Sequence, residues 1–330
     1  MSAVAGPTTI TYRDAVRLAI GDAMEADPDV FVIGEDVGAA GGAFKLTDGL
    51  FERFGPGRVC DTPISEQAIV GVAIGAAVQG LRPVAEIMFS DFAAVCFDGL
   101  ANELPKMRYM TGGQVTVPVT VRLSNGAGGF AAQHSQPAEN WFLNIPGLKI
   151  ALPSTPANTY ALLRGAIEDE DPVLVFEHRR LLGLTGEMPP EPTPMRLGVA
   201  ETVRSGDHVT VVAAQLMRHR ALEAAERLAE EGIEVDLIDP LSLIPLDLAT
   251  VISSIERTNR LVVVQEASAN GSWGASLIAR VCRDQFELLD APPELVACDD
   301  TPVPYAGELE EAWMPSVADI EAAIRATVSF

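Results

Sequence analysis

Basic residues and cysteines are scarce in this sequence. Its 23 lysines and arginines stand against 46 aspartates and glutamates, and the formal net charge is −23 at pH 7. So acidic a chain repels nucleic acid and anionic membranes, which argues against both as partners. The four cysteines lie far apart in the sequence and form no CxxC pair, a pattern typical of free thiols in a reducing compartment.

Long apolar runs and the common phosphate-binding motifs are also missing. Neither end of the chain has a window of about 18 uncharged apolar residues or a basic and apolar leader, so a soluble, cytoplasmic protein is expected. No GxxxxGK[ST] loop and no GDG motif occur. One glycine-rich fingerprint, Gly126 to Ala131, follows a predicted strand but continues into QHSQPAEN. A dinucleotide site needs a helix there and an acidic residue further on, so nicotinamide and flavin binding are disfavoured.

The order of apolar segments indicates two α/β domains. A length of 330 residues is typical of two domains, and 48% hydrophobic residues support a large core. Residues 1–181 alternate short apolar strands with helices, among them predicted helices from Tyr12 to Ala26 and from Asp91 to Tyr109. This alternation predicts a doubly wound, mainly parallel sheet. Residues 182–200, rich in proline and glycine, are expected to form a linker, and a smaller α/β domain is predicted over 201–330.

The segment DTPISEQAIVGVAIGAA, which begins at Asp61, carries one carboxylate into an apolar helix. The helix is predicted from Ile64 to Gln79, and Glu66 lies in its first turn. A carboxylate among small apolar residues is costly to bury unless a donor binds it, and the segment holds no lysine or arginine. That donor can be a ligand. Alternatively, Thr62 caps the helix and Glu66 only complements the helix dipole.

Histidine is the other candidate for chemistry. His134 lies in a loop rich in glycine and alanine after a predicted strand, where catalytic groups are common. His178 follows a strand, whereas His208 and His219 lie among charged residues and are expected at the surface. A loop histidine on its own is also compatible with no catalytic role.

Several motifs, in order along the chain, resemble the beta subunits of thiamin-diphosphate-dependent 2-oxo acid dehydrogenases. They are FVIGEDVG from Phe31, DTPISE followed by GVAIGAA, NGAGGFAAQHSQPAENWF from Asn125, PGLKIALPSTP from Pro146 and DPVLVFEH from Asp171. The resemblance runs from about Thr9 to the C-terminal helix. It implies a thiamin pyrimidine-binding domain followed by a transketolase C-terminal-like domain.

The resemblance assigns Glu66 to the pyrimidine of thiamin diphosphate. A carboxylate hydrogen-bonded to the N1′ nitrogen favours the imino tautomer of the cofactor, which removes the proton from thiazolium C2. Phe92 is expected against the face of the aminopyrimidine, and Glu35 beside the cofactor. Glu35, Glu66 and Asp98 match positions that line a polar tunnel between paired active sites in relatives. Alternatively, Phe92 is a core aromatic and Glu35 a residue of a strand-end turn.

The same resemblance implies roles for a loop and for an acidic helix end. It places His134 at the mouth of the active site, where it binds the substrate carboxylate and transfers protons during reductive acylation of the lipoyl group. It also implies a monovalent cation, K⁺, held by oxygen ligands. The ligands expected for this ion are Val119, Ala166, Ile167, Asp169 and Asp171. The segment AIEDEDP is more acidic than its counterparts in relatives, and the alternative is a solvated helix end.

The missing GDG motif has a specific meaning within this family. Thiamin enzymes hold the diphosphate through Mg²⁺, which a GDG motif and a later asparagine bind. A chain with the pyrimidine-side motif alone is expected to provide half of a site, and an alpha subunit to provide Mg²⁺ and the diphosphate side. The resemblance thus implies a heterotetramer of two alpha and two beta chains. It also implies a dihydrolipoyl acyltransferase partner with its lipoyl domain.

The reaction implied is that of an oxidoreductase whose acceptor is the lipoyl disulfide. A carbon–carbon bond of the substrate is cleaved, and the acyl group passes to the lipoyl arm. AAQHSQ is more similar to the pyruvate and acetoin types than to the branched-chain type, and pyruvate is the substrate expected. PSTP, FEHRRLL and GEMP favour acetoin instead, and a branched-chain 2-oxo acid stays an alternative. Another class of function is a non-catalytic α/β binding subunit of an electron-transfer complex, which bound flavin would reveal.

Overall fold

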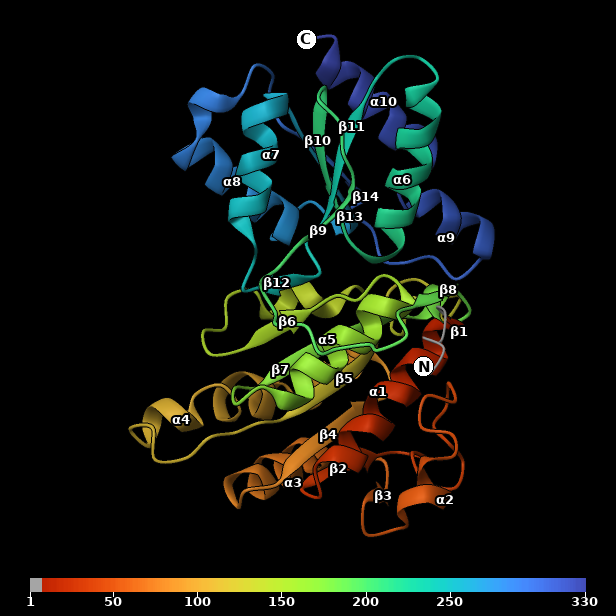
Figure 1. Cartoon of the computed structure of the whole chain (residues 1–330), viewed down its shortest axis with the longest axis vertical. Coiled ribbons are helices and arrows are strands. Elements are labelled where there is room, and N and C mark those ends of the chain that lie inside the picture. Colours follow the sequence, from red (N-terminus) through yellow and green to blue (C-terminus); the bar gives the residue numbers. More distant parts are fainter. Residues whose placement is uncertain (1–7) are drawn as a thin grey trace, which may run out of the picture. The chain divides into compact units, whose positions relative to one another are not determined.

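The computed structural model describes residues 8–330, which form two compact units (Figure 1). The first unit comprises the described chain up to Asn125 and the stretch from Trp141 to Leu197. The second comprises Gly126–Asn140 and Gly198–Phe330. The loop that carries His134 therefore belongs to the second unit, although strands of the first unit flank it in the sequence. Among residues 8–330, no helix is long and apolar enough to cross a membrane.

The first unit is built on a parallel sheet. Its strands are β2 (Val30–Gly34), β3 (Val59–Asp61), β4 (Arg82–Ile87), β5 (Thr120–Asn125), β6 (Lys149–Ala151) and β7 (Val173–His178). They lie in the order β6-β7-β5-β4-β2-β3, and each neighbouring pair is parallel. β5 and β7 are buried along their whole length, as expected for central strands of a sheet covered on both faces. The predicted doubly wound sheet is confirmed.

The helices of the first unit are α1 (Tyr12–Ala26), α2 (Leu50–Phe54), α3 (Glu66–Val78), α4 (Met107–Met110) and α5 (Pro156–Glu168). α1 has the predicted bounds, because the Thr11 hydroxyl accepts a hydrogen bond from the Asp14 backbone N–H as its cap. α1 and α5 lie side by side (Figure 1). A short antiparallel pair joins β1 (Thr8–Thr11) to β8 (Thr185–Met188), and β8 falls within the expected linker.

The prediction of one long helix after β4 is wrong. A 3₁₀ turn, Ser90–Ala94, and a π turn, Gly99–Glu103, precede the short helix α4. Pro105 has no backbone N–H with which to bind the Ala101 carbonyl. The Lys106 ammonium binds that carbonyl instead, at 2.5 Å.

The start of α3 also differs from the prediction. The helix begins at Glu66 rather than Ile64, and its N-cap residue is Ser65, whose side chain makes no capping hydrogen bond. Thr62 does not cap the helix, because its Oγ1 has no hydrogen-bond partner among the described residues. Its backbone N–H donates to the Gly34 carbonyl at 2.9 Å and so continues the sheet. Glu66 is thus the first residue of α3, next to the edge of the sheet.

The second unit is a smaller α/β sheet, as predicted. The strands of this sheet are β9 (Glu201–Arg204), β10 (Val209–Ala213), β11 (Val235–Asp239), β13 (Leu261–Ser268) and β14 (Glu294–Cys298). The short strand β12 (Ser242–Ile244) lies outside this sheet. Its helices are α6 (Gln215–Ala229), α7 (Leu248–Thr258), α8 (Trp273–Asp284), α9 (Gly307–Trp313) and α10 (Val317–Val328). The sheet order is β14-β13-β10-β11-β9, in which β9 alone runs antiparallel to its neighbour.

Strand β10 shows how the layers of the second unit are specified. Val209 and Val211 pack with α6 and α10, whereas the hydroxyl of Thr210 between them bonds to Ser254 and Thr258 of α7. Alternate residues of a strand point to opposite faces, so β10 supports a helical layer on each side (Figure 1).

Candidate functional site

The strand order of the first unit contains a topological switch point. From β2 the chain passes to β3 on one side, and from β4 it passes to β5 on the other. Open α/β sheets bind ligands at such a point, outside the carboxyl ends of the strands. Glu35 follows β2, Glu66 follows β3 after a short turn, and Phe92 lies in the turn after β4. The fold therefore brings three predicted site residues to the carboxyl ends of neighbouring strands.

Glu35 and Glu66 are close enough to interact electrostatically. Burial raises the pKa of the Glu35 carboxyl, and the negative charge of Glu66 raises it further. A hydrogen bond from the Ser65 backbone partly opposes this shift. The Glu66 side chain is only 7% exposed. Two carboxylates in a partly desolvated place repel each other, and a ligand with N–H donors would relieve that repulsion.

Two oxygen atoms at this edge support a ligand on physical grounds. Glu35 Oε1 and Thr62 Oγ1 are buried and have no hydrogen-bond partner among the described residues. A buried polar atom without a partner costs about 1–3 kcal/mol, so such atoms call for a ligand or a water molecule. An aminopyrimidine offers N–H groups to acceptors of this kind. The residues present therefore fit the pyrimidine side of thiamin diphosphate.

Phe92 lies in a half-buried aromatic cluster near Glu66. Its ring meets that of Phe89 edge-on, with 5.6 Å between centroids, and Phe89 meets Phe44 in the same way at 5.7 Å. One turn beyond Phe92, burial and then the charge of Glu66 raise the pKa of the Cys96 thiol to about 12. The turn from Phe92 to Cys96 is therefore close to Glu66, as a pyrimidine-stacking role requires.

Asp98, the third residue predicted to line a tunnel, lies at the surface of the chain, and its place in a tunnel stays a prediction. Its side chain is exposed, and Oδ1 accepts a hydrogen bond from Asn102 Nδ2 at 2.7 Å. It is not among the groups that shift the pKa of Glu35, whereas Glu86 is.

Sequence reasoning missed a buried ion triad that includes Glu86. Arg122 on β5 donates to both oxygens of Glu177 on β7, at 2.8 and 2.7 Å, and to Glu86 on β4 at 2.6 Å. The exposed fractions are 1%, 2% and 7% for Arg122, Glu177 and Glu86. The parallel register places Glu86 opposite Arg122. The sequence does show one acidic or basic residue, Glu86, Arg122 or Glu177, within each of the apolar strands VAEI, VRLS and VFEH, and this pattern could have indicated the triad.

The loop Gly126–Asn140 is fastened by carboxylates of the second unit. Ala127 N–H donates to Glu266 at 2.6 Å, and the next two glycine N–H groups donate to Glu310 Oε1 at 3.1 and 2.9 Å. The glycine fingerprint therefore binds the chain's own carboxylates, and β5 is not followed directly by an α-helix.

His134 is half-buried in the middle of this loop. Its backbone N–H donates to the Ala131 carbonyl at 3.3 Å, and the neighbouring Ser135 is fully buried. At the far end of the loop, Asn140 Oδ1 accepts the Trp273 N–H at 2.9 Å. The loop is thus held at both ends.

The other histidines have structural surroundings. His178 is buried at the end of β7, where its Nδ1 accepts the Arg180 N–H at 3.2 Å. His208 is exposed, as predicted, whereas His219 on α6 is half-buried.

The oxygens predicted to bind a monovalent cation already accept hydrogen bonds from the chain. The carbonyls of Val119, Ala166 and Ile167 accept from the Val173 N–H, the Asp169 N–H and the Arg82 guanidinium, at 3.0, 3.3 and 3.3 Å. The Asp169 carboxylate accepts from the Lys149 ammonium at 2.7 and 2.8 Å, and Asp171 lies 3.2 Å from the same ammonium. Each of the three carbonyls keeps a second lone pair, but the ammonium bound to both oxygens of Asp169 does not fit a metal cation at that carboxylate.

Comparisons with known proteins agree with the fold. Two family models match: the transketolase pyrimidine-binding domain over residues 8–185 and the transketolase C-terminal domain over 198–320. The chain is 47% identical to the acetoin:2,6-dichlorophenolindophenol oxidoreductase subunit beta of Cupriavidus necator, with 97% of each chain covered. It is 42% identical to the pyruvate dehydrogenase E1 component subunit beta-1 of Arabidopsis thaliana, with 97% of this chain and 89% of the relative covered. A solved split-gene transketolase, an inactive beta4 tetramer, has a TM-score of 0.81 at 25% identity, covering 98% of this chain and 99% of that chain.

Fold and site together define a two-unit α/β protein with a carboxylate pair at the switch point of its first sheet. The chain belongs to the transketolase-like family with a pyrimidine-binding domain, which confirms the resemblance found in the sequence. Its relatives include beta subunits named for acetoin, pyruvate and 2-oxoisovalerate.

Proposed function

We propose that this chain is the beta subunit of a thiamin-diphosphate-dependent 2-oxo acid dehydrogenase. The enzyme cleaves its substrate next to a carbonyl group and passes the acyl group to a lipoyl arm. One observation carries the proposal: the buried Glu66, first residue of α3, lies beside Glu35 at the switch point of a pyrimidine-binding domain. Relatives that are 42% to 47% identical and are named as beta subunits support the reaction class.

Glu66 is the residue that activates the cofactor in this proposal. Bound thiamin diphosphate supplies the carbanion chemistry that no side chain of the chain can supply. The Glu66 carboxylate accepts a hydrogen bond from the protonated N1′ nitrogen, and its burial strengthens that charge-assisted bond. Phe92 offers an aromatic face to the pyrimidine. The polar path proposed from Glu66 leads through Glu35 toward Glu86, because these carboxylates interact, and not through the exposed Asp98.

His134 is the residue proposed to act in acyl transfer. Its imidazole binds the substrate carboxylate and moves a proton while the lipoyl group is acylated. The bonds of its loop to Glu266 and Glu310 support this role, since a general acid or base needs a fixed position.

An alpha subunit is part of the proposal. The chain has no GDG motif, so the alpha subunit would bring Mg²⁺ and the diphosphate side of the site. Exposed apolar side chains next to the proposed site support a protein partner, with Val72 of α3 53% exposed and Val95 57% exposed. A dihydrolipoyl acyltransferase with its lipoyl domain is the proposed second partner, in the cytoplasm. Domain boundaries near residues 181 and 201 stay a prediction that limited proteolysis can test.

The proposal is tested by expressing the chain together with its alpha subunit. The complex receives thiamin diphosphate, Mg²⁺ and lipoamide, with pyruvate, acetoin or 2-oxoisovalerate as substrate. We expect lipoamide to be acylated with one of them, and we propose pyruvate, with acetoin as the first alternative. A folded complex that cleaves none of the three would contradict the proposal. Bound flavin would favour the electron-transfer alternative, against which the occupied glycine fingerprint argues.

A further inference from the structure

The carboxylates that follow α5 are bound by a lysine from a different strand. The Lys149 ammonium lies 2.7 and 2.8 Å from the two oxygens of Asp169, and 3.2 Å from Asp171 Oδ2. The Lys149 side chain is 28% exposed and that of Asp169 is 18% exposed, so the pair is partly desolvated. The position of the ammonium follows from the sheet. Lys149 is the first residue of β6 and pairs in register with Val173, which closely follows the two aspartates.

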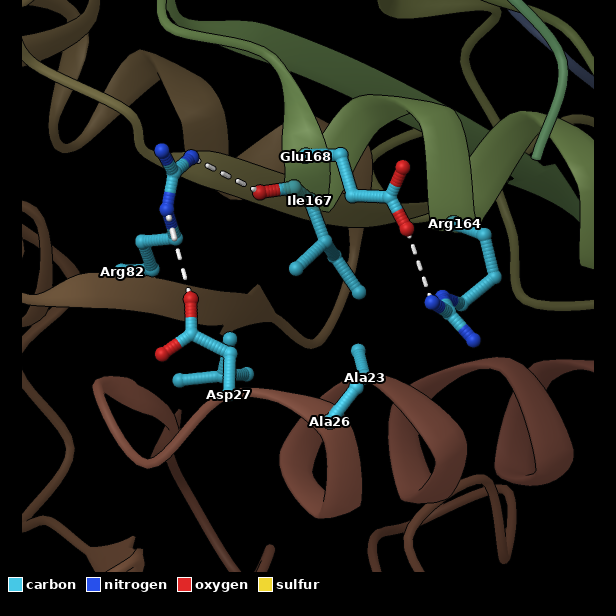
Figure 2. A pocket seen from close by; sticks show the side chains of 8 residues that line it. Ala23, Ala26, Asp27, Arg82, Arg164, Ile167 and Glu168 are labelled. Atoms are coloured by element: carbon cyan, nitrogen blue, oxygen red, sulfur yellow. Dashed lines mark hydrogen bonds and ion pairs between the residues drawn. The ribbon is translucent and has the colours of Figure 1, made fainter.

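We define the acidic corner as Lys149 and residues 167–171. Two arginines from outside the corner, Arg108 and Arg82, also donate hydrogen bonds to it. Arg108 donates to Asp171 Oδ1 at 2.7 Å. Arg82 donates to the carbonyl oxygens of Ile167 and Asp169 at 3.3 and 3.2 Å. Figure 2 shows Arg82 at the Ile167 carbonyl, beside a cavity of about 200 Å³ lined by residues of α1 and α5. Each oxygen of the corner that the family resemblance offers to a metal thus has a donor from the chain.

The charges of the acidic corner balance without a metal. A helix C-terminus with carboxylates beside it attracts a cation. Here Asp169 and Asp171 face Lys149 and Arg108. The other two carboxylates of the corner, Glu168 and Glu170, pair with Arg164 and Arg82. A metal ion would have to displace the ammonium or lie beside it against strong repulsion. We propose that the Lys149 ammonium replaces the monovalent metal cation in this chain, so that the folded protein does not need K⁺.

The first test compares thermal unfolding of the full chain in KCl, NaCl and choline chloride at equal ionic strength. We expect the same unfolding midpoint in all three salts. Crystals soaked in Rb⁺, a heavier substitute for K⁺, are expected to show no anomalous peak at Asp169. A midpoint raised by K⁺ alone, or a Rb⁺ peak at that carboxylate, would overturn the proposal. This test needs no variant.

The second test removes the built-in cation. Lys149→Met keeps most of the apolar stem and leaves Asp169 without its ammonium. We expect its midpoint in choline chloride to fall by about 2–4 °C, and K⁺ to restore much of the loss. Lys149→Arg keeps the charge and is expected to show no response to K⁺. Lys106→Met is the matched control, because its ammonium binds the Ala101 carbonyl rather than a carboxylate. A loss in Lys149→Met that is equal in all three salts would overturn the proposal.

Discussion

The start of α3 and the loop from Gly126 to Asn140 each carry a proposed functional residue, yet they are built differently. Glu66 is the first residue of a regular helix, and the residues around it come from the ends of neighbouring strands in one sheet. His134 lies in a loop whose bonds run to residues 133 to 182 positions further along the chain.

This difference predicts how the two regions respond to change. A residue at the start of a helix is positioned by its own segment and by the sheet edge, so distant substitutions leave it in place. A loop held by remote carboxylates moves when those carboxylates are lost. Changes in the second unit are therefore expected to impair the function of His134 and to spare that of Glu66.

The largest effect is expected from the ion triad next to the Glu35–Glu66 region. Arg122→Met leaves Glu86 and Glu177 buried without their cation, and loss of one partner of a buried pair costs about 3–5 kcal/mol. Urea unfolding of the full chain measures the loss. Arg53→Met is the control, because its ion pair with Glu25 is exposed and contributes less than about 1 kcal/mol. If the two variants lose the same free energy of unfolding, the buried ion triad does not stabilise the fold more than an exposed ion pair does.

The next largest effect is expected at His134. His134→Ala is expected to slow acylation of the lipoyl domain by about a hundredfold or more, the contribution of one acid–base group. Its unfolding midpoint is expected to stay within a few degrees of the wild type, because the side chain is only half-buried. Both are measured on the complex with the alpha subunit. A large fall of the midpoint with normal acylation per folded enzyme would show that His134 is structural.

A smaller effect is expected from the residue that holds the His134 loop. Glu310→Ala removes the acceptor of two loop N–H groups and is expected to slow lipoyl acylation about tenfold through loss of positioning. Glu310→Gln keeps an acceptor oxygen and is expected to recover part of the rate. Glu308→Ala on the same helix is exposed and serves as the control. If Glu310→Ala slows cofactor activation as much as acylation, the second unit does not act on His134 alone, and the proposed difference between the two regions is wrong.

The smallest effect concerns charge at Glu35. Because the folded pKa of Glu35 is raised, its contribution to stability is present below the unfolded pKa of about 4.3 and is lost as the pH rises through the folded pKa. Glu35→Gln is therefore expected to be slightly more stable than the wild type at pH 7 and equal to it at pH 4, as measured by urea unfolding. Asp98→Asn, at an exposed carboxylate, is expected to show no such difference. A Glu35→Gln variant less stable at pH 7 would contradict the repulsion between Glu35 and Glu66.

The sequence was sufficient where local chemistry decides the structure. It predicted α1 and β10 to the residue, because a cap and an apolar pattern define them. It also marked Glu66 and Phe92 by their motifs. Both follow neighbouring parallel strands, and their roles stay predictions. The prediction failed after β4, where Pro105 interrupts the predicted helix. In the same segment Gly99 packs closely against α3, since a Cβ there would lie 2.8 Å from Val70.

Pairings across the sheets were beyond prediction from the sequence. Arg122 bonds to residues 36 and 55 positions away, and Lys149 finds Asp169 through the β6–β7 register. The partners of Arg122 and of Lys149 can be named only once the order of the strands in the sheet is known. The family resemblance assigned the Asp169 oxygens to a metal. Its motif PGLKIALPSTP contains Lys149, but a motif does not show which residue that lysine contacts.

Exchange of the thiazolium C2 hydrogen for deuterium tests the central claim most directly, because it reports cofactor activation before any substrate reacts. It is measured in the complex with the alpha subunit, for the wild type, Glu66→Gln and His134→Ala. A neutral amide cannot support the N1′ nitrogen as a carboxylate does, so Glu66→Gln is expected to slow exchange about a hundredfold. His134→Ala is expected to exchange at the wild-type rate. Unchanged exchange in Glu66→Gln would contradict the account and leave Glu66 as a residue of the helix end.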